Sequence, residues 1–338
     1  QEGSSWDEIQ SLAKALEREG VDAINTGIGW HEARIPTIAT LVPRGGFAFV
    51  TKKLMGHVGD PLITTNRFNT IDACETALQS GCADMVSMAR PFLADPEIVN
   101  KSKTNPHSVN TCIGCNQACL DHIFQNKIAT CLVNPRASYE SKWPLQAKAT
   151  KVRSVAVVGS GPAGLSAAIE AARLGHQVTL FESTAEIGGQ FNMAKRIPGK
   201  EEFHETLRYF DFMLTHYDVN LQLNTEADVN SLLRFDHVVL ATGVKPRAWD
   251  IAGAETPEVL SYLDVLKRKV EPGKRVAIIG AGGIGFDVAE YLTHTKIPGF
   301  FEEWGIDQSL SSRGGVNSPE LVQSPRSIHI FQRSAGKV

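Results

Sequence analysis

The 338-residue sequence carries little net charge, because 34 lysines and arginines face 37 aspartates and glutamates. A net charge of −3 gives no reason to expect a nucleic acid or an anionic membrane surface as a partner. The sequence also lacks an apolar run long enough to cross a bilayer and lacks a secretory signal pattern. We therefore expect a cytoplasmic protein that acts on a small molecule, and nothing in the sequence indicates its oligomeric state.

An initial methionine is also missing, and the sequence opens directly on a helical pattern and stops after an apparent strand. From this we expect an internal piece of a longer enzyme, and the sequence leaves open whether the piece alone is active. Its length suits two domains and part of a third, and 42% apolar residues suffice for ordinary cores.

Cysteine is scarce, with six in the whole sequence, yet four of them lie between residues 112 and 131. This segment lacks the two separated C-x2-C pairs of a typical four-cysteine zinc site. Three cysteines come close together and the fourth follows later, a spacing that favours a 4Fe–4S cluster, with zinc as the alternative. A disulfide framework suits a long chain without a secretory signal poorly. The predicted cluster ligands are Cys112, Cys115, Cys119 and Cys131.

Strands and helices alternate before these cysteines. Apolar patterns predict strands at 21–25, 61–65 and 84–88, and helices at 71–79 and 93–101. Such alternation implies parallel strands, and three units at the end of a domain are typical of the last part of a (β/α)8 barrel. We assign residues 1–104 to this barrel part and 105–150, which lack clear periodicity, to the cluster segment and a linker.

Two arginines occupy matched positions in the barrel part. Arg67 follows the second expected strand and Arg90 follows the third, at the ends where barrels often bind phosphate. Either alone is more simply a surface ion pair, but the matched pair predicts the phosphate of a flavin mononucleotide (FMN). His31 follows the first strand, on the face that carries catalytic groups in barrels, although a lone loop histidine is more often structural.

A glycine-rich fingerprint begins the next expected domain, 151–270. A strand at 154–158 enters Gly-x-Gly-x-x-Gly, and a second strand at 177–181 ends in an acid that suits adenosine ribose hydroxyls. An Ala-Thr-Gly pattern at 241–243 resembles that of flavoproteins with two dinucleotide sites, so we expect FAD here. The residues expected to contact it are Gly159, Gly161, Gly164, Glu182, Gly189, Gln190, Thr242 and Gly243.

A second fingerprint, Gly280, Gly282 and Gly285, opens an incomplete domain at 271–338. Residues 294–326 have no clear period and are interpreted as an insertion. The strand at 327–331 lacks a terminal acid and is followed by Arg333 and Lys337, which favours the 2′-phosphate of NADPH over NADH. The alternative is that Arg333 is merely solvated. The expected fold is thus α/β: a barrel end, an iron–sulfur loop and two Rossmann-like domains, the second truncated.

Three stretches, 25–39, 88–95 and 111–120, resemble the bacterial NADPH-dependent 2,4-dienoyl-CoA reductases. In this part of the old yellow enzyme class, the barrel is fused to a cluster and a flavin reductase. The resemblance implies reduction of 2,4-dienoyl-CoA thioesters in fatty acid β-oxidation, with electrons passing from NADPH through FAD, the 4Fe–4S cluster and FMN. It implies that His31 donates a proton together with a tyrosine that this chain lacks. It also implies FMN contacts at Arg67, Ala89 and Arg90, and FAD contacts at Ala163, Glu182 and Gln190.

Other functions remain open on the sequence alone. Within the same class these are an enoate reductase, a steroid reductase or an amine dehydrogenase, the last of which would not need the second nucleotide site. From another class, the chain could be a non-catalytic electron-transfer module. A proton donor at His31 argues against that module, because a pure electron conduit needs none.

Overall fold

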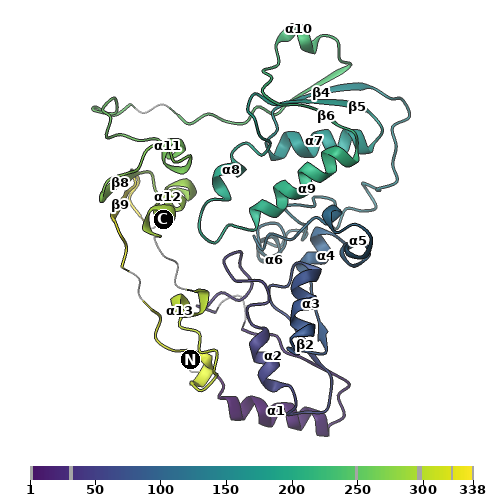
Figure 1. Ribbon diagram of the computed structural model, residues 1–338, viewed down its shortest axis with the longest axis vertical. Coiled ribbons are helices and arrows are strands. Elements are labelled where there is room, and N and C mark those ends of the chain that lie inside the picture. The colour runs from purple at the N-terminus through teal and green to yellow at the C-terminus, as the bar shows by residue number, and fades with distance from the viewer. Residues whose placement is uncertain (1–2, 30–32, 248–249, 295–298, 321–322, 337–338) are drawn as a thin grey trace. The chain divides into compact units, whose positions relative to one another are not determined.

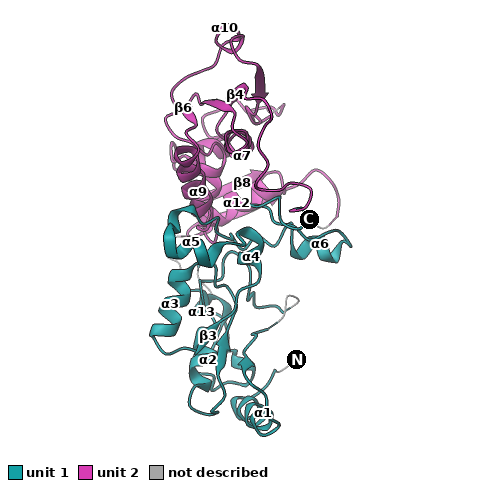
Figure 2. Cartoon of the chain, turned by 90° about the vertical axis from the view of Figure 1, so that its right-hand side faces the viewer, with its two compact units in different colours: residues 1–139, 296–323 teal, residues 140–295, 324–338 magenta. Residues whose placement is uncertain are grey.

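The computed structural model describes residues 3–29, 33–247, 250–294, 299–320 and 323–336 (Figure 1). The chain divides into two compact units, one of residues 1–139 with 296–323 and one of residues 140–295 with 324–338 (Figure 2). The finer division into four segments at 104, 150 and 270 stays a prediction. Over the ranges just given, no helix is both long and apolar enough to cross a membrane.

The first unit is built on a parallel sheet of three short strands in the order β1 (Ile24–Asn25), β2 (Leu62–Thr64) and β3 (Met85–Val86). The sequence predicted all three strands and their parallel direction, but each is shorter than expected. The helical segments of this unit are α1 (Trp6–Arg18), α2 (Ala48–Leu54), α3 (Ile71–Gln79), α4 (Arg90–Ala94), α5 (Ile98–Thr104), α6 (Leu120–Phe124) and α13 (Phe300–Trp304), with 3-10 turns η1 (Pro106–Ser108) and η2 (Arg313–Gly315).

Local sequence explains where these helices begin and end. Helix α1 begins at a capping box, in which Glu8 N–H donates to Ser5 Oγ at 3.2 Å and Ser5 N–H donates to the Glu8 carboxylate at 2.8 Å. Such a cap contributes about 1 kcal/mol. The single helix predicted over 93–101 is wrong, because two helices meet there. Pro96 disfavours helical backbone at the preceding residue, and Asp95 is extended at φ −146°.

The predicted insertion is not an irregular loop, since residues 299–320 pack on the first unit. Phe301 of α13 stands edge-on to Phe49 with ring centroids 5.9 Å apart, and Gly314 N–H donates to the Ser4 carbonyl at 2.8 Å. The polypeptide therefore leaves the second unit after α12, contributes this segment to the first unit, and returns for its last strand.

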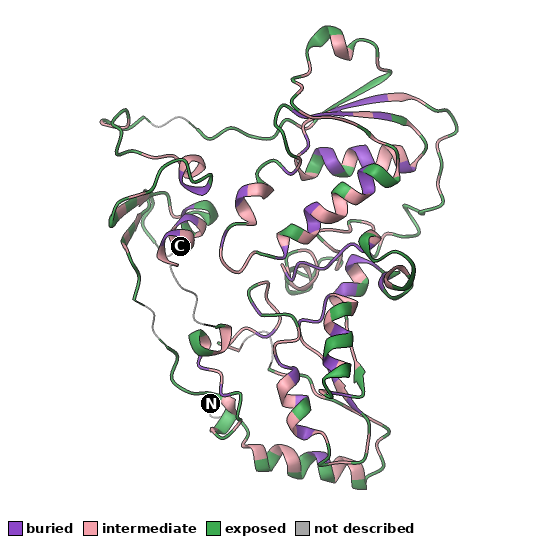
Figure 3. Ribbon diagram, viewed as in Figure 1, coloured by how far each residue is buried: buried purple, intermediate pink, exposed green. Residues whose placement is uncertain are grey.

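The second unit contains a four-stranded parallel sheet in the order β6-β5-β4-β7. Helices α7 and α9 cover one of its faces (Figure 1). Buried residues run through the central strands and the inner side of α7 (Figure 3), and Val157, Leu165 and Leu180 are fully buried. Burying each such side chain stabilises the fold by about 1.5–3 kcal/mol. The elements are β4 (Ser154–Val158), α7 (Pro162–Arg173), β5 (Gln177–Phe181), α8 (Phe191–Ala194), α9 (Phe203–His216), β6 (Asn220–Gln222), α10 (Val229–Leu232) and β7 (His237–Leu240).

A second, two-stranded parallel sheet pairs β8 (Arg275–Ile279) with β9 (Ser327–Phe331), the latter with the bounds predicted. Helix α12 (Gly283–Thr293) follows β8 and packs with α11 (Tyr262–Leu266) around buried Val288 and Leu292. An ion pair of 2.5 Å between Lys200 and Asp287 joins this region to the preceding sheet domain. The 28-residue range 296–323 lies between α12 and β9 in sequence, and the pairing of β8 with β9 is intact despite it.

Candidate functional site

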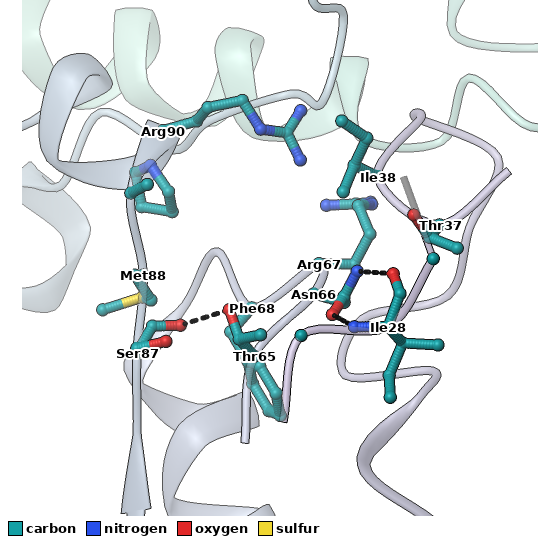
Figure 4. A pocket seen from close by; sticks show the side chains of 14 residues that line it. Ile28, Thr37, Ile38, Thr65, Asn66, Arg67, Phe68, Ser87, Met88 and Arg90 are labelled. Atoms are coloured by element: carbon teal, nitrogen blue, oxygen red, sulfur yellow. Dashed lines mark hydrogen bonds between the residues drawn. The ribbon is translucent and has the colours of Figure 1, made fainter. Parts of the chain in front are cut away.

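A pocket of about 290 Å³ lies where the three strands of the first unit end (Figure 4). The loops that follow β1, β2 and β3 each contribute to its wall, as expected when parallel strands present their carboxyl ends at one edge. The lining residues are Gly27, Ile28, Gly29, Thr37, Ile38, Thr65, Asn66, Arg67, Phe68, Ser87, Met88, Ala89, Arg90 and Pro91.

The Asn66 side chain ties two of these loops together. Its Oδ1 accepts from Ile28 N–H and its Nδ2 donates to the Ile28 carbonyl, both at 3.0 Å (Figure 4). Asn66 has a left-handed backbone, φ 71°, which asparagine tolerates better than most residues. Thr65 Oγ1 adds a 3.3 Å bond to the Ser87 carbonyl of the third loop. The sequence alone indicates no role for Asn66, because its hydrogen-bond partner lies 38 residues away.

All three predicted FMN phosphate residues, Arg67, Ala89 and Arg90, line this pocket. Arg67 is buried, with its Nε donating to the Val42 carbonyl at 3.0 Å. Arg90 is half-buried at the start of α4, and both guanidinium groups can be followed in Figure 4. Two guanidinium groups at one strand edge fit a phosphate by charge and by donor chemistry. His31 lies outside the described residues, as does Lys337.

A second pocket of the same unit is lined by all four predicted cluster ligands, Cys112, Cys115, Cys119 and Cys131, together with Arg90. All six cysteines of the chain are free thiols. Within the described ranges, no three His, Cys, Asp or Glu side chains are arranged to hold a metal ion. Thiolates are ligands that both iron–sulfur clusters and zinc select, so the four thiols suit either centre, and the cluster stays a prediction.

The protonation of these thiols follows from their surroundings. Burial raises the pKa of Cys131 to about 11. Burial also raises the pKa of Cys112, while Gly114 N–H and the positive charges of Arg90 and Arg67 oppose that rise. Binding of a metal centre must therefore release protons, because only thiolates act as ligands.

Amide side chains hold the cysteine loops in place. Asn69 Nδ2 donates to the Cys112 carbonyl at 2.8 Å, and Asn110 Nδ2 donates to the Val133 carbonyl at 2.7 Å, two residues after Cys131. Thr40 Oγ1 donates to the Ile113 carbonyl at 2.8 Å. No local pattern in the sequence indicates these supporting residues, since each donor pairs with a carbonyl 23 to 73 residues away.

In the second unit, the predicted FAD residues gather at the ends of β4, β5 and β7. A Cβ at Gly164 would lie 1.8 Å from the Gly159 carbonyl oxygen, so only glycine lets α7 pack this closely on the strand. Gly161 has open space instead, as a pyrophosphate would require. Gln190 Nε2 donates to the Val244 carbonyl at 3.1 Å and so joins its loop to the residues after Thr242 and Gly243.

Glu182 is held by the chain itself. One carboxylate oxygen accepts from Ser160 N–H at 2.9 Å and from Ser160 Oγ at 2.7 Å, and the other accepts twice from Thr184 at 2.8 Å. Burial works against ionisation, but these hydrogen bonds outweigh it and hold the pKa of Glu182 below its usual range. The carboxylate is therefore charged at neutral pH. A ribose hydroxyl would have to replace one of the side-chain hydroxyl donors.

The second fingerprint repeats this geometry with different chemistry. Gly280 N–H donates to the Phe331 carbonyl at 2.8 Å, as Gly159 N–H does to the Phe181 carbonyl. A Cβ at Gly285 would lie 2.0 Å from the Gly280 carbonyl oxygen, the counterpart of Gly164. The residue after β9 that corresponds to Glu182 is thus the neutral Gln332, and the next, Arg333, is exposed with no partner among the residues described.

Two protein families match the chain. Residues 3–108 match the NADH:flavin oxidoreductase / NADH oxidase family, and residues 153–297 match the pyridine nucleotide-disulphide oxidoreductases. The first match coincides with the pocket of Arg67 and Arg90, and the second contains both glycine fingerprints. The predicted class of flavin-dependent oxidoreductase is supported by this order of families, whereas the dienoyl-CoA substrate is not specifically shown.

Curated relatives and solved structures agree with these families. The chain is 37% identical to a metal reductase of Desulforamulus reducens over 85% of this chain and 44% of that protein. It is 32% identical to a cinnamate reductase of Clostridium sporogenes, over 83% of this chain and 42% of that protein. A 2-naphthoyl-CoA reductase structure is 33% identical with a TM-score of 0.80, over 85% of this chain and 44% of that chain.

The chain thus spans less than half the length of these relatives. The matches support an α/β fold with a barrel-type part and a Rossmann-like part, and support flavin and nicotinamide nucleotide as ligands. In the order of its two matches, the chain is similar to flavin-dependent oxidoreductases that join an NADH:flavin oxidoreductase / NADH oxidase part to a pyridine nucleotide-disulphide oxidoreductase part.

Proposed function

We propose that this chain is part of an NADPH-dependent reductase of conjugated acyl-CoA thioesters, of the 2,4-dienoyl-CoA type. One observation carries the proposal: Arg90 lies in the wall of both the arginine pocket and the four-cysteine pocket. A phosphate-bearing flavin and a cluster would then be neighbours. When bound, FAD, the cluster and FMN would convert two-electron chemistry at the nucleotide into single-electron transfer and back again.

Each group would be held by residues of this chain. Arg67, Ala89 and Arg90 would bind the FMN phosphate, and Cys112, Cys115, Cys119 and Cys131 would ligate the cluster. In the second unit, the FAD residues are Gly159, Gly161, Ala163, Gly164, Glu182, Gly189, Gln190, Thr242 and Gly243. NADPH would contact Gly280, Gly282, Gly285, Arg333 and Lys337. The imidazole of His31 would donate the proton that completes reduction of the conjugated acyl chain.

The class of substrate is argued from the resemblance and from the names of two relatives. One relative is named for a naphthoyl-CoA thioester and another for cinnamate. Both substrates carry a carbonyl group conjugated to unsaturated carbon, as a dienoyl-CoA does. Metal reduction is the rival function, because a metal reductase has the higher identity among the relatives described above. An amine dehydrogenase is less compatible with a second nucleotide fingerprint.

We propose NADPH and not NADH as the reductant because the two nucleotide folds differ at the residue that follows their second strand. The carboxylate of Glu182 is buried and charged beside its glycine loop, and would repel a 2′-phosphate. At the matching position, Gln332 is neutral, and its Nε2 donates to the Gly336 carbonyl at 2.7 Å. The exposed guanidinium of Arg333 is then available to a phosphate, which it can bind through two N–H donors.

Replacing Arg333 by alanine is expected to weaken NADPH about 10- to 100-fold, since a hydrogen bond to a charged group contributes about 1.5–3 kcal/mol. NADH binding should change little, because NADH has no 2′-phosphate. Binding of both nucleotides is measured on the complete protein by titration, with Arg275→Ala, at the far end of β8, as control. Equal weakening of both nucleotides would make Arg333 a structural residue.

Turnover of a substrate panel by the complete protein tests the proposed function itself. The panel contains a 2,4-dienoyl-CoA, a 2-enoyl-CoA, free cinnamate, a secondary amine and a soluble ferric chelate, each with NADPH as the reductant where reduction is measured. We expect kcat/KM for the dienoyl-CoA to exceed that for every other compound. A higher value for the ferric chelate, or oxidation of the amine, would replace the proposal by the corresponding rival.

A further inference from the structure

Arg90 connects the two pockets of the first unit through one hydrogen bond. Its Nη1 donates to Oδ1 of Asn116, which lies between Cys115 and Cys119. Asn116 has a left-handed backbone at φ 62°, and its own carbonyl accepts from Asp121 N–H at 3.0 Å at the start of α6. The side chain and the backbone of Asn116 therefore both contribute to the turn that carries two of the four thiols.

We propose that the Arg90–Asn116 hydrogen bond couples binding of a flavin phosphate in the arginine pocket to the cysteine turn, with Asn116 as a positioning residue for the metal centre. This inference rests on the proposed function in two respects: the arginine pocket takes the phosphate of FMN, and the four cysteines take a metal centre. It goes further in making the two binding events depend on each other.

The geometry of arginine makes this coupling physically reasonable. A guanidinium has five N–H donors in a rigid plane, so one can remain on Asn116 while others meet a phosphate. A bound phosphate would restrict Arg90, and a restricted Arg90 would hold Asn116 in a backbone conformation that few residues adopt readily. By thermodynamic linkage, a metal centre that needs this turn must strengthen phosphate binding by the same factor.

The coupling is measured with two flavins that differ only in the phosphate. FMN and riboflavin are titrated into the complete protein with its cysteines loaded and again after removal of the metal centre. We expect FMN to bind about 5- to 150-fold more tightly to the loaded protein, the usual range for coupled sites. Riboflavin should bind almost equally to both forms, because it cannot contact Arg90 through a phosphate. An equal effect on the two flavins would overturn the proposal.

Variants of the turn locate the coupling. The FMN ratio is the dissociation constant of FMN from the metal-free protein divided by that from the loaded protein. Asn116→Ala removes the acceptor and is expected to bring this ratio close to one, while Asn116→Asp keeps an acceptor and should restore it. Gln117→Ala, an exposed neighbour on the same turn, is the matched control and should retain the native ratio. A native ratio in Asn116→Ala would refute the role of the bond. Circular dichroism and the visible spectrum of the metal centre show whether each variant is folded and loaded.

The proposed function can fail separately from this inference. If the cysteines take up zinc without sulfide, the cluster is excluded, and the same flavin titrations are made with the zinc-loaded protein. A phosphate-dependent ratio in that protein would support the coupling, and a ratio of one would refute it.

Discussion

Replacing Cys131 by alanine is expected to reduce bound iron and acid-labile sulfide from about four of each per chain to background. Its thiol lines the same pocket as those of Cys112, Cys115 and Cys119, but comes from a later segment of the chain. That segment is held beside the cysteine turn by a 2.7 Å hydrogen bond from Thr130 N–H to the Ala118 carbonyl. Loss of this ligand leaves one iron without its thiolate, and we expect the cluster to be lost during isolation for that reason.

Loss of the cluster should block electron transfer to FMN but not to FAD. FAD reduction by NADPH should keep its native rate, because the FAD residues lie in the second unit. FMN reduction by NADPH should fall to background. Anaerobic stopped-flow spectroscopy separates the two flavins, and Cys82→Ala, a half-buried thiol outside the pocket, is the control. Full iron content in Cys131→Ala, or stoichiometric zinc without sulfide in the native protein, would contradict the cluster assignment.

Replacing His31 by alanine is expected to slow dienoyl-CoA reduction by ~10²–10⁴, the usual cost of losing one general acid. The residues just before His31 belong to the site, since Gly27, Ile28 and Gly29 line the pocket that holds Arg67 and Arg90. An imidazole has an unperturbed pKa of about 6.5 and can donate a proton at neutral pH. Reduction of FAD and FMN by NADPH should stay nearly unchanged, because neither step uses this proton.

Two measurements separate catalysis by His31 from a packing role. Rapid mixing of the reduced protein with dienoyl-CoA gives the rate of the substrate half-reaction, and flavin and iron content show whether the site is intact. His57→Ala serves as control, since this exposed residue packs edge-on to Trp6, outside the pocket, with ring centroids 6.2 Å apart. If His31→Ala loses FMN or iron, the residue is structural and its catalytic role is wrong.

Local sequence was enough to predict elements whose signals lie within a few residues. Strands β4, β5 and β9 and the two glycine fingerprints follow from short-range pattern, and the structure has all of them. Each depends on backbone conformation or on a period of two or three to four residues. The helix expected over 93–101 failed for the opposite reason, because one proline overrode an otherwise regular apolar pattern.

The sequence also predicted which side chains form the candidate sites, but not how those sites are built. It assigned Arg90 to a phosphate, and the structure adds that the same side chain lies in the wall of the cysteine pocket. It gave no role to Asn69 or Asn110, whose amides hold the cysteine loops. Asparagine is common in loops, so its presence there gives no signal about a distant partner.

The sequence by itself therefore predicted the class of protein through the resemblance of three stretches, and the four kinds of ligand through glycine spacing, cysteine spacing and the matched arginines. Only the tertiary structure decided that Gln332 takes the position of Glu182, and that Asn116 receives a hydrogen bond from Arg90. The reason is physical: a motif encodes local backbone geometry, whereas a hydrogen bond between residues 26 apart exists only once the cysteine segment has folded against the start of α4.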